Sequence, residues 1–326
     1  MDEQSQKQQK KPPKKLPRFL TRLIAALVVL AVFLALVVMV AFRDQLNMDS
    51  IKRYFTYLSL TRSDSGQADA FSYDGELSDT FAVLDGDLLV CSRNAISLYS
   101  GSGTQYINQS VSMTNPVVNT NGSLAVVYDA GGSSLYILGQ RSLVWSTDEL
   151  EPILSARLNR SGQLTVATQA SGYRGMVTVY DASYSPVMSI NLSSAFVMDA
   201  ALSDNGHTLA ILTAGQSGGA FDTGLSLYAM TYSNGTYQPD ASCSLGGGVV
   251  LDVRHTSSAV WTLSDQGLDI TDHSGRSVHT DWADRYLRRY TLSGNGFALA
   301  LLGKYHAGSQ AELWVIDQQG QRQTLS

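Results

Sequence analysis

A glycine-containing turn followed by a short apolar strand recurs along most of the chain. This repeat limits the chain to folds that are built from similar β-strand units. The fullest copy spans residues 202–211 (LSDNGHTLAI), and further strands end in an aromatic or acidic residue, such as 176–181 (MVTVYD). The turn glycines follow one another at intervals of 36, 40, 44 and 90 residues: Gly86, Gly122, Gly162, Gly206 and Gly296. The last interval includes a unit with Thr256-Ser257-Ser258 in place of a glycine turn. A period of about 40 residues with short strands predicts the blades of a β-propeller.

Six such units divide the C-terminal part of the chain, at residues 79–113, 114–153, 154–196, 197–247, 248–286 and 287–326. We therefore predict an all-β domain over residues 68–326, a β-propeller of six four-stranded blades with seven as the alternative. The strands are uniformly apolar, which fits blades that pack against a neighbour on each face. If the six units do not close the ring by themselves, residues 68–77 would complete a blade, since an open ring exposes strand edges. A two-sheet sandwich is the competing fold.

Residues 23–42, from Leu23 to Phe42, form a second constraint, because they contain no charge, proline or glycine. A helix of this length rises about 30 Å, the thickness of the hydrocarbon core of a bilayer. The run is long for a signal peptide and no small-residue cleavage site follows, which favours a retained transmembrane helix over a cleaved signal. Residues 1–22 hold seven Lys/Arg and two Asp/Glu, the composition of a cytoplasmic tail. We expect a single-pass plasma-membrane protein whose C-terminal domain lies outside the cytoplasm.

Residues 43–67 are expected to form a juxtamembrane segment and linker. Four apolar residues have the spacing of one helical face: Ile51, Tyr54, Phe55 and Leu58. This pattern favours a short amphipathic helix at the headgroup layer over a dimerisation helix. Residues 43–326 carry sixteen Lys/Arg against twenty-six Asp/Glu. Such an acidic domain argues against nucleic-acid binding, which needs a basic surface.

The turn at residues 203–210 (SDNGHTLA) resembles the Ser-x-Asp-Gly-x-x-Leu-Ala turn of WD40-like and TolB-like propellers. The layout of the whole chain, with its basic tail, apolar helix and acidic Tyr/Gly-rich domain, also resembles a bacterial family of unknown function. Members of that family are single-pass membrane proteins with an extracytoplasmic propeller, and they are often about one blade longer. The resemblance implies fold and location, but it brings no catalytic residue that can be transferred to this chain.

The chain carries no recognisable catalytic or metal-binding motif: no nucleophile elbow, His-Glu-x-x-His sequence, phosphate-binding loop or calcium loop. We assign the histidines to different units, with no pair at metal-ligand spacing, and expect structural or exposed roles, no metal and no cofactor: His207, His255, His273, His279 and His306. Cys91 and Cys243 are placed in opposite blades, too far apart for a disulfide. The five Asn-x-Ser/Thr sequences are interpreted as incidental: Asn108, Asn121, Asn159, Asn191 and Asn234.

Loops that follow the second strand of a unit vary in length and are the main candidates for a binding face. They include residues 129–133, 169–175, 214–224 and 304–310. The candidate binding residues, aromatic or charged, are Tyr173, Arg174, Phe221, Asp222, Lys304, Tyr305 and His306. The alternative is the ordinary tolerance of loops for length and sequence.

A second candidate is the segment 281–290 (DWADRYLRRY), in which three arginines alternate with three aromatic residues. It would either stack on a glycan or clamp a carboxylate-rich partner, or form an inter-blade connection packed by its aromatic rings. We favour the packed connection.

These features favour a membrane-anchored, extracytoplasmic binding or scaffold module for an envelope protein or a cell-wall polymer, without catalytic activity. The alternative is a propeller enzyme, either a glycan-acting hydrolase or lyase or a quinone-dependent dehydrogenase, because propellers host such activities. An enzyme would need convergent carboxylates or histidines near the channel mouth, for which Asp222 and His306 are the candidates. A structural element of a larger complex is a third possibility.

Overall fold

The computed structural model describes residues 79–101, 103–230, 237–307 and 310–325. The chain separates into two compact units, Met1–Asp64 and Ser65–Ser326, and all described residues belong to the second. The predicted basic tail (1–22), transmembrane helix (23–42) and juxtamembrane segment (43–67) lie outside the described residues, as do residues 68–77. Within the described part, no helix is both long enough and apolar enough to span a membrane.

The described residues form six antiparallel sheets of four strands, and each sheet consists of four strands that are consecutive in the chain. The first three sheets contain β1 (Thr80–Leu84), β2 (Asp87–Cys91), β3 (Ala95–Tyr99) and β4 (Gln105–Ser110); β5 (Pro116–Thr120), β6 (Leu124–Asp129), β7 (Leu135–Gly139) and β8 (Ser142–Thr147); β9 (Ile153–Leu158), β10 (Leu164–Thr168), β11 (Gly175–Tyr180) and β12 (Pro186–Leu192). We call them sheets one to three.

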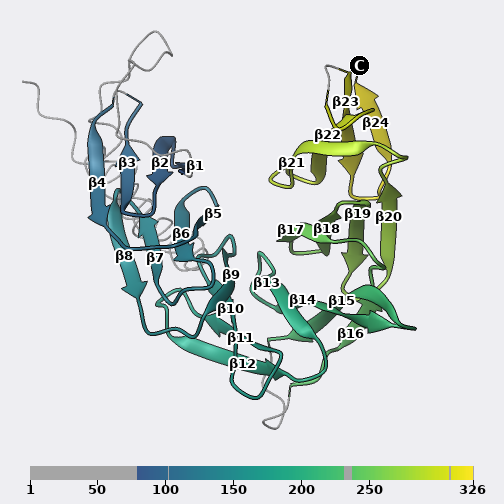
Figure 1. Ribbon diagram of the computed structural model, residues 1–326, viewed down its shortest axis with the longest axis horizontal. Helices are drawn as coiled ribbons and strands as arrows, with labels where there is room; N and C mark the ends of the chain where they lie inside the picture. The colour runs from purple at the N-terminus through teal and green to yellow at the C-terminus, as the bar shows by residue number, and fades with distance from the viewer. Residues whose placement is uncertain (1–78, 102, 231–236, 308–309, 326) are drawn as a thin grey trace, which may run out of the picture. The chain divides into compact units, whose positions relative to one another are not determined.

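Sheets four to six repeat this plan. They contain β13 (Phe196–Leu202), β14 (Thr208–Ser217), β15 (Ala220–Ala229) and β16 (Ala241–Ser244); β17 (Val250–His255), β18 (Ala259–Ser264), β19 (Gly267–Asp272) and β20 (Ser277–Asp281); β21 (Tyr286–Thr291), β22 (Phe297–Gly303), β23 (Ala311–Asp317) and β24 (Arg322–Leu325). In Figure 1 the sheets follow one another in chain order, with the first strand of each towards the middle and the fourth at the rim.

The predicted repeat units coincide with these sheets. Three of the predicted boundaries are displaced by one residue, because β9, β13 and β21 begin at Ile153, Phe196 and Tyr286. Six four-stranded sheets exclude the two-sheet sandwich. Sheets one and six each have four strands of their own, so neither needs residues 68–77 to supply a missing strand.

The predicted glycine turns are confirmed by the backbone. All five turn glycines have a positive φ, between 73° and 97°: Gly86, Gly122, Gly162, Gly206 and Gly296. A side chain at Gly206 would also bring its Cβ to 2.4 Å from the Gln163 amide oxygen of sheet three. In the unit without a glycine turn, Thr256 Oγ1 accepts the N–H of Ala259 at 3.1 Å and closes the turn instead.

Neighbouring sheets pack face to face through five clusters of buried apolar side chains, one between each consecutive pair. Alternate residues of one strand serve two clusters, because successive side chains point to opposite faces of a sheet. In β14, Leu209 and Ile211 pack towards sheet three, whereas Ala210 and Leu212 pack towards sheet five. The uniformly apolar strands are explained by this double burial, as predicted.

The second and third strands of each sheet are the most buried, whereas the first strands beside the channel and the fourth strands at the rim are more exposed. Every residue of β10 is buried, whereas every residue of β24 is exposed. Cys91 lies on β2 and Cys243 on β16, in sheets one and four, and both are free. Burial, together with the charge of Asp79, raises the pKa of Cys91 to about 12, so this thiol is unreactive at neutral pH.

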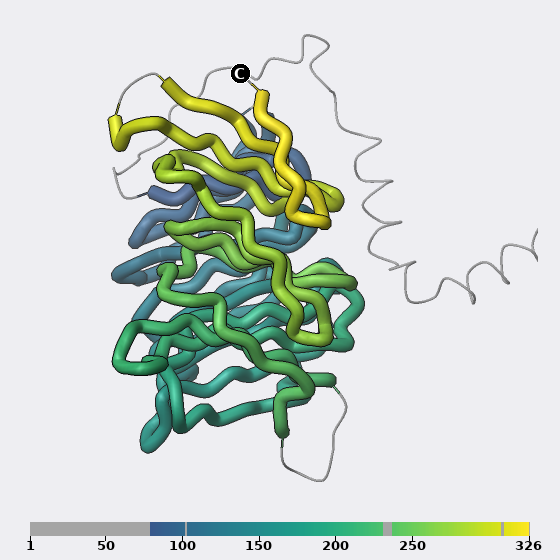
Figure 2. Tube along the Cα trace, turned by 90° about the vertical axis from the view of Figure 1, so that its right-hand side faces the viewer, coloured from purple at the N-terminus to yellow at the C-terminus, as the bar shows by residue number. Residues whose placement is uncertain are grey.

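Because consecutive strands run in opposite directions, the turns gather on two opposite faces of the domain (Figure 2). One face holds the short turns between first and second strands, and we call it the tight-turn face. The other holds the loops between second and third strands and the connections between sheets, and we call it the long-loop face. Backbone hydrogen bonds join the two kinds of segment on the long-loop face, such as Gln169 N–H to Pro152 O at 2.9 Å.

Candidate functional site

Residues of the first strands of all six sheets, or of the turns that follow them, line a cavity of about 600 Å³, which is open between sheets one and six because these two sheets lie apart (Figure 1). Each sheet contributes residues from the end of its first strand or from the following turn, including Val83, Thr120, Asn159, Asp204, Arg254 and Ser293. These positions place the cavity next to the tight-turn face. Its lining mixes exposed apolar groups with fixed charges, the combination that orients a bound ligand.

A second cavity, of about 340 Å³, lies towards the long-loop face and is lined by the earlier residues of the same strands, such as Leu154 and Val250. Four side chains line both cavities and mark the place where the cavities meet: Asn119, Arg157, Asp252 and Tyr290. The centre of the domain is therefore a channel in two parts with polar groups between them.

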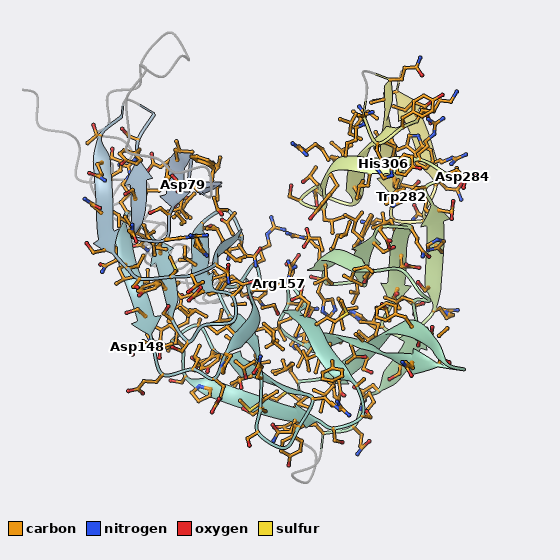
Figure 3. All side chains as sticks on the ribbon, in the orientation of Figure 1. Asp79, Asp148, Arg157, Trp282, Asp284 and His306 are labelled. Carbon is orange, nitrogen blue, oxygen red and sulfur yellow. The ribbon has the colours of Figure 1, made fainter. Side chains whose placement is uncertain are left out.

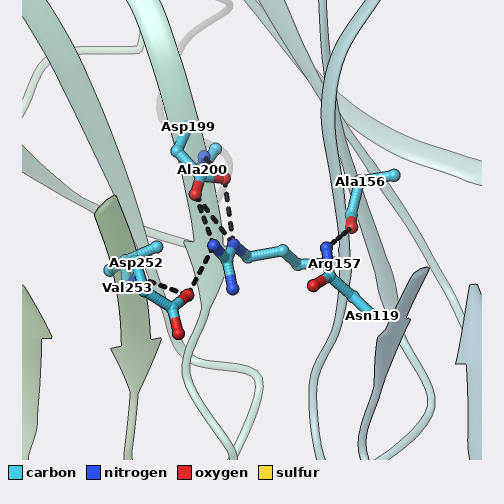
Figure 4. Close-up of polar contacts among 7 residues, drawn as sticks. All are labelled: Asn119, Ala156, Arg157, Asp199, Ala200, Asp252 and Val253. Atoms are coloured by element: carbon cyan, nitrogen blue, oxygen red, sulfur yellow. Dashed lines mark hydrogen bonds and ion pairs between the residues drawn. The ribbon is translucent and has the colours of Figure 1, made fainter. Parts of the chain in front are cut away.

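Arg157 of β9 is the central group of this channel and lies towards the middle of the sheets in Figure 3. Its Nε and Nη2 bind both carboxylate oxygens of Asp199 on β13, with a shortest distance of 2.7 Å, and Nη2 also binds Asp252 Oδ1 of β17 at 2.8 Å (Figure 4). One guanidinium thus joins sheets three, four and five. We call these three residues the channel cluster.

The charges of the channel cluster compensate one another. Burial by itself would lower the pKa of Arg157, but the neighbouring Asp199 and Asp252 outweigh burial and raise this pKa above its ordinary value. A fork of guanidinium N–H groups on a carboxylate is among the strongest charge-assisted arrangements in proteins. The channel cluster is therefore fixed in place before any ligand arrives.

Both aspartates of the channel cluster sit at β-bulges. The strand register shifts between Val197 and Asp199 in β13, and between Val250 and Asp252 in β17. Each aspartate accepts the backbone N–H of the residue that follows it at 2.8 Å. Bulges of this kind re-aim a side chain, and here they accompany the two carboxylates that face Arg157.

Hydrogen bonds between successive turns fix the mouth of the larger cavity on the tight-turn face. Asp85 N–H donates to Gly122 O at 2.9 Å, Asn121 Nδ2 to Asn159 O at 2.8 Å, and Asn159 Nδ2 to Ser203 O at 2.9 Å. These bonds link sheets one to four in order. Two of the five Asn-x-Ser/Thr sequences, those that begin at Asn121 and Asn159, therefore have asparagines with a structural role.

The next step around the mouth is an ion pair. Arg254 Nη2 of sheet five lies 3.4 Å from Asp204 Oδ2 in the sheet-four turn, and both residues line the larger cavity. The side chain of Arg254 is one-third exposed. Arg254 is thus a charged group at the mouth that a ligand can reach, whereas Arg157 lies deeper in the channel.

The predicted loop residues lie apart from this channel, and none of them lines either cavity. Tyr173 is half exposed, and the Arg174 guanidinium lies 4.5 Å from the centre of the Phe196 ring. In sheet six, Lys304 Nζ lies 5.6 Å from the centre of the Tyr305 ring, and His306 packs on Tyr286. We call these two groups the loop patches. They belong to sheets three and six and are not brought together.

The predicted loop at 214–224 is wrong. β14 and β15 continue through this region as a long hairpin closed by Gly218 and Gly219, both with positive φ. Phe221 pairs with Gln216 in that hairpin, and Asp222 accepts a hydrogen bond from Ser244. The segment contains four glycines and looks like a loop in sequence, but pairing between the two strands is made by backbone hydrogen bonds and does not need apolar side chains.

Within the segment 281–290, residues 282–285 form the connection between sheets five and six that was favoured from the sequence, whereas residues 286–290 belong to β21. Trp282 is buried, its Nε1 donates to Ser264 O at 3.0 Å, and its ring packs near that of Trp314. Arg285 forms an ion pair with Glu312 at 2.8 Å. Most of the segment therefore ties sheet five to sheet six, while Tyr290 lines the channel.

The assignment of the histidines to separate units is wrong for three of them. His255, His273 and His279 all belong to sheet five, and the Nε2 atoms of His255 and His273 lie 3.3 Å apart. The two residues are eighteen positions apart in the chain and belong to no short local motif. The hairpin β18–β19 brings them together.

The sequence does contain a signal for the channel residues. Charged side chains interrupt otherwise apolar first strands, as in 153–158 (ILSARL), 196–202 (FVMDAAL) and 250–255 (VLDVRH). A charge in a strand that packs on both faces needs a partner, because unpaired buried charges are costly. A charged residue in such a strand therefore predicts that an oppositely charged partner exists. It does not show which residue that partner is, because the partner comes from a different sheet.

The fold and the cavity together define the class of protein. Six four-stranded meanders, whose first strands share a central channel, make the domain a β-propeller. The chain belongs to a family of unknown function, DUF5711, whose model matches residues 64–324. The match covers all six sheets.

Several solved structures are similar to this chain at low sequence identity. Kuenenia stuttgartiensis hydrazine synthase has a TM-score of 0.50 at 12% identity, over 73% of this chain and 76% of that chain. The Myceliophteria thermophila Cps50 (Swd1) β-propeller domain has a TM-score of 0.49 at 10% identity, over 79% and 89%. The C-terminal WD40 domain of Sif2 has a TM-score of 0.48 at 12% identity, over 73% and 68%. No curated protein matches the chain.

Proposed function

We propose that this protein is a membrane-anchored binding module whose propeller takes its ligand at the central cavity on the tight-turn face. The observation that carries the proposal is the convergence of all six first strands on one cavity of about 600 Å³. Its mouth is fixed by bonds from turn to turn and presents the reachable ion pair of Arg254 and Asp204. A rigid concave site with a few placed charges is what a binding module needs.

The proposed partner is an envelope protein or a cell-wall polymer. Support comes from the sequence: an uncharged segment at 23–42, a basic segment before it and an acidic domain after it. In this proposal the propeller lies outside the cytoplasm. A reporter fused after Ser326 that is active only outside the cytoplasm should therefore be active in intact cells, and an inactive reporter in a stably produced fusion would reject the location.

Site-specific photo-crosslinking in intact cells tests the site. Val83 is 63% exposed on the cavity wall, and Tyr305 is 58% exposed in a loop patch. We expect a crosslinker at Val83 to yield a discrete adduct and one at Tyr305 to yield none. Arg254→Ala should reduce the Val83 adduct at least fivefold, because it removes the charge at the mouth.

The matched control is Arg276→Ala. Arg276 also belongs to sheet five and also pairs with an aspartate, Asp272 at 2.9 Å, but it is 85% exposed and lies outside the cavity. This replacement should leave the adduct unchanged. If joint replacement of Tyr173, Arg174, Tyr305 and His306 by alanine abolishes the adduct while Arg254→Ala does not, the binding site lies on the long-loop face instead.

An enzymatic role is the second candidate, and one observation bears on it. Asp199 and Asp252 are two carboxylates side by side in the channel, the kind of pair that glycoside hydrolysis uses. However, both bind the same Arg157 nitrogen, so the arginine fills the space that a scissile bond would need. Hydrolysis of cell-wall glycans that is lost in both Asp199→Asn and Asp252→Asn would favour the enzyme over the binding module.

A further inference from the structure

The smaller cavity of the channel lies towards the long-loop face, on the other side of the channel cluster from the mouth of the site proposed above. Its walls are largely apolar, and the aliphatic side chains that line it are Val117, Leu154, Met198, Val250 and Leu251. Its volume of about 340 Å³ is at the lower end of the range of about 300–1,000 Å³ for small-ligand sites. The cavity therefore suits a short apolar group.

The charged end of this cavity is negative overall. Its charged lining consists of the channel cluster, in which one guanidinium faces two carboxylates. Asp252 is the more accessible carboxylate, because 27% of its side chain is exposed against 13% for Asp199. Only Oδ1 of Asp252 is engaged by Arg157, at 2.8 Å, and no described residue forms a hydrogen bond with Oδ2 (Figure 4). A carboxylate oxygen is thus left to accept from a ligand.

An aromatic ring lies within electrostatic reach of that carboxylate. Tyr290 of β21 lines the cavity together with Asp252. Burial and the charge of Asp252 raise the pKa of Tyr290, whereas the charge of Arg157 acts in the opposite direction. Both an unpaired carboxylate oxygen and the face of an aromatic ring attract a cation. Two different groups at the same end of the cavity therefore favour positive charge.

Arg157 offers the opposite possibility, an anionic ligand, but its surroundings oppose it. No described residue forms a hydrogen bond with its Nη1 (Figure 4). However, Nε and Nη2 hold Asp199 at 2.7–3.0 Å, and Nη2 holds Asp252 as well. An anion at Nη1 would lie beside two carboxylates and one guanidinium. Like charges so placed disfavour binding, so the cluster selects against an anion.

We propose that the smaller cavity binds an aliphatic ammonium group, carried by a free amine or by the lysine side chain of a protein. The ammonium donates to Asp252 Oδ2 and lies against the Tyr290 ring, while its methylene groups pack on the apolar walls. The inference does not rest on the proposed function, since it concerns the other cavity and a ligand of its own.

Equilibrium dialysis of radiolabelled n-hexylamine against the full-length chain in mild detergent tests the site, with detergent micelles alone as the blank. A primary alkylamine is an ammonium ion at neutral pH, as lysine is. We expect one n-hexylamine per chain. Unlabelled n-hexanol and n-hexanoate, which have the same chain length without the positive charge, should compete at least tenfold less well than unlabelled n-hexylamine. Equal competition by either compound overturns the proposal.

Asp252→Asn keeps the size of the side chain but removes its charge, and it should lower the affinity for n-hexylamine at least tenfold. The matched control is Asp265→Asn. Asp265 also belongs to sheet five and accepts the N–H of Val249 at 2.7 Å, but it lines neither cavity. The control should bind n-hexylamine like the unmodified chain. Unchanged affinity in Asp252→Asn, or an equal loss in both variants, overturns the proposal.

Leu251→Lys tests the site without changing the channel cluster. Leu251 is 49% exposed, so its replacement leaves the buried clusters intact. The new ammonium at the cavity wall should repel the probe and lower its affinity at least fivefold. If Asp252→Asn fails to fold, this variant decides, and unchanged affinity in it overturns the proposal.

A peptide measurement separates the two sources of the ammonium group. If a blocked Gly-Lys-Gly peptide displaces labelled n-hexylamine at lower concentration than unlabelled n-hexylamine does, the site takes a lysine side chain. If the peptide needs a higher concentration, the site takes a free amine. A blocked Gly-Glu-Gly peptide should not displace the probe, and displacement by it at the concentration of the lysine peptide overturns the proposal.

Discussion

The channel cluster and the loop patches both contain charged residues, but they differ in how firmly neighbouring groups hold those residues. In the channel cluster, Arg157 sits on a strand and is held by two carboxylates from two other sheets, at 2.7 and 2.8 Å. In the loop patches, Tyr173 and Tyr305 are about half exposed. The comparison teaches that the charged side chains held in place by ion pairs lie on the strands. The residues that stand out in the sequence lie instead on loops of variable length outside the channel.

The largest expected effect is that of removing the central arginine. Arg157→Ala leaves Asp199 and Asp252 facing each other without a cation, and breaking a buried ion pair costs about 3–5 kcal/mol. The free energy of unfolding from urea denaturation should fall by that amount. Arg174→Ala, in a loop patch, should change it by less than about 0.5 kcal/mol. Equal losses in the two variants would erase the distinction between the two regions.

A pH effect comes next and concerns the cavity edge. Burial, and to a smaller extent the neighbouring His273, lowers the pKa of His255 to about 4 from 6.5, although its bond to Ala201 acts in the opposite direction. Between these values the unfolded chain binds a proton that the folded chain does not, so stability is present above pH 6.5 and is lost as the pH falls towards 4. The loss amounts to about 3 kcal/mol.

His255→Asn keeps an N–H for Ala201 but cannot titrate, so its free energy of unfolding should depend less steeply on pH between 7 and 4 than that of the unmodified chain. The difference between the two curves isolates His255 from the carboxylates that also titrate. Parallel curves would show that the ring is not buried as described.

The turn-to-turn bonds allow a third test. Asn159 is buried, donates to Ser203 O and to Gln163 Oε1, and accepts the N–H of Gln163. Asn159→Ala should cost about 1–3 kcal/mol in thermal or urea unfolding, because it removes these three hydrogen bonds and leaves the Gln163 N–H without its acceptor. Asn191→Ala, on the exposed face of β12, is the control and should have almost no effect. A similar loss in both variants would contradict the role of the turns in fixing the mouth.

The smallest expected effect is that of the joint alanine replacement of Tyr173, Arg174, Tyr305 and His306. The two tyrosines are about half exposed, and Arg174 rests on one ring face, so each residue should contribute less than about 0.5 kcal/mol to unfolding. Near-unchanged unfolding makes this variant a clean probe of ligand capture. A loss of several kcal/mol would show that the loop patches are structural.

Several features could be predicted from the sequence because they are local. A turn favours glycine at a positive φ whatever surrounds it, and the recurrence of such turns placed the four strands of each sheet in one unit, with at most one residue of a strand outside it. Trp282 was assigned to a packed connection because a large aromatic ring beside a turn is usually buried. The hairpin of β14 and β15 was missed, since pairing of its Gly- and Gln-containing strands depends on backbone bonds rather than on an apolar pattern.

The amino-acid sequence by itself determined the repeat units and most of their strands and turns, since each depends on residues within a span of about 40 positions. The tertiary structure alone decided the sites. Arg157 meets Asp199 and Asp252 across 42 and 95 residues, and His255 meets the carbonyl of Ala201 across 54. Those partners depend on which sheets become neighbours around the channel. The sequence pattern does not show which residues of different sheets meet, because they meet only when the sheets pack.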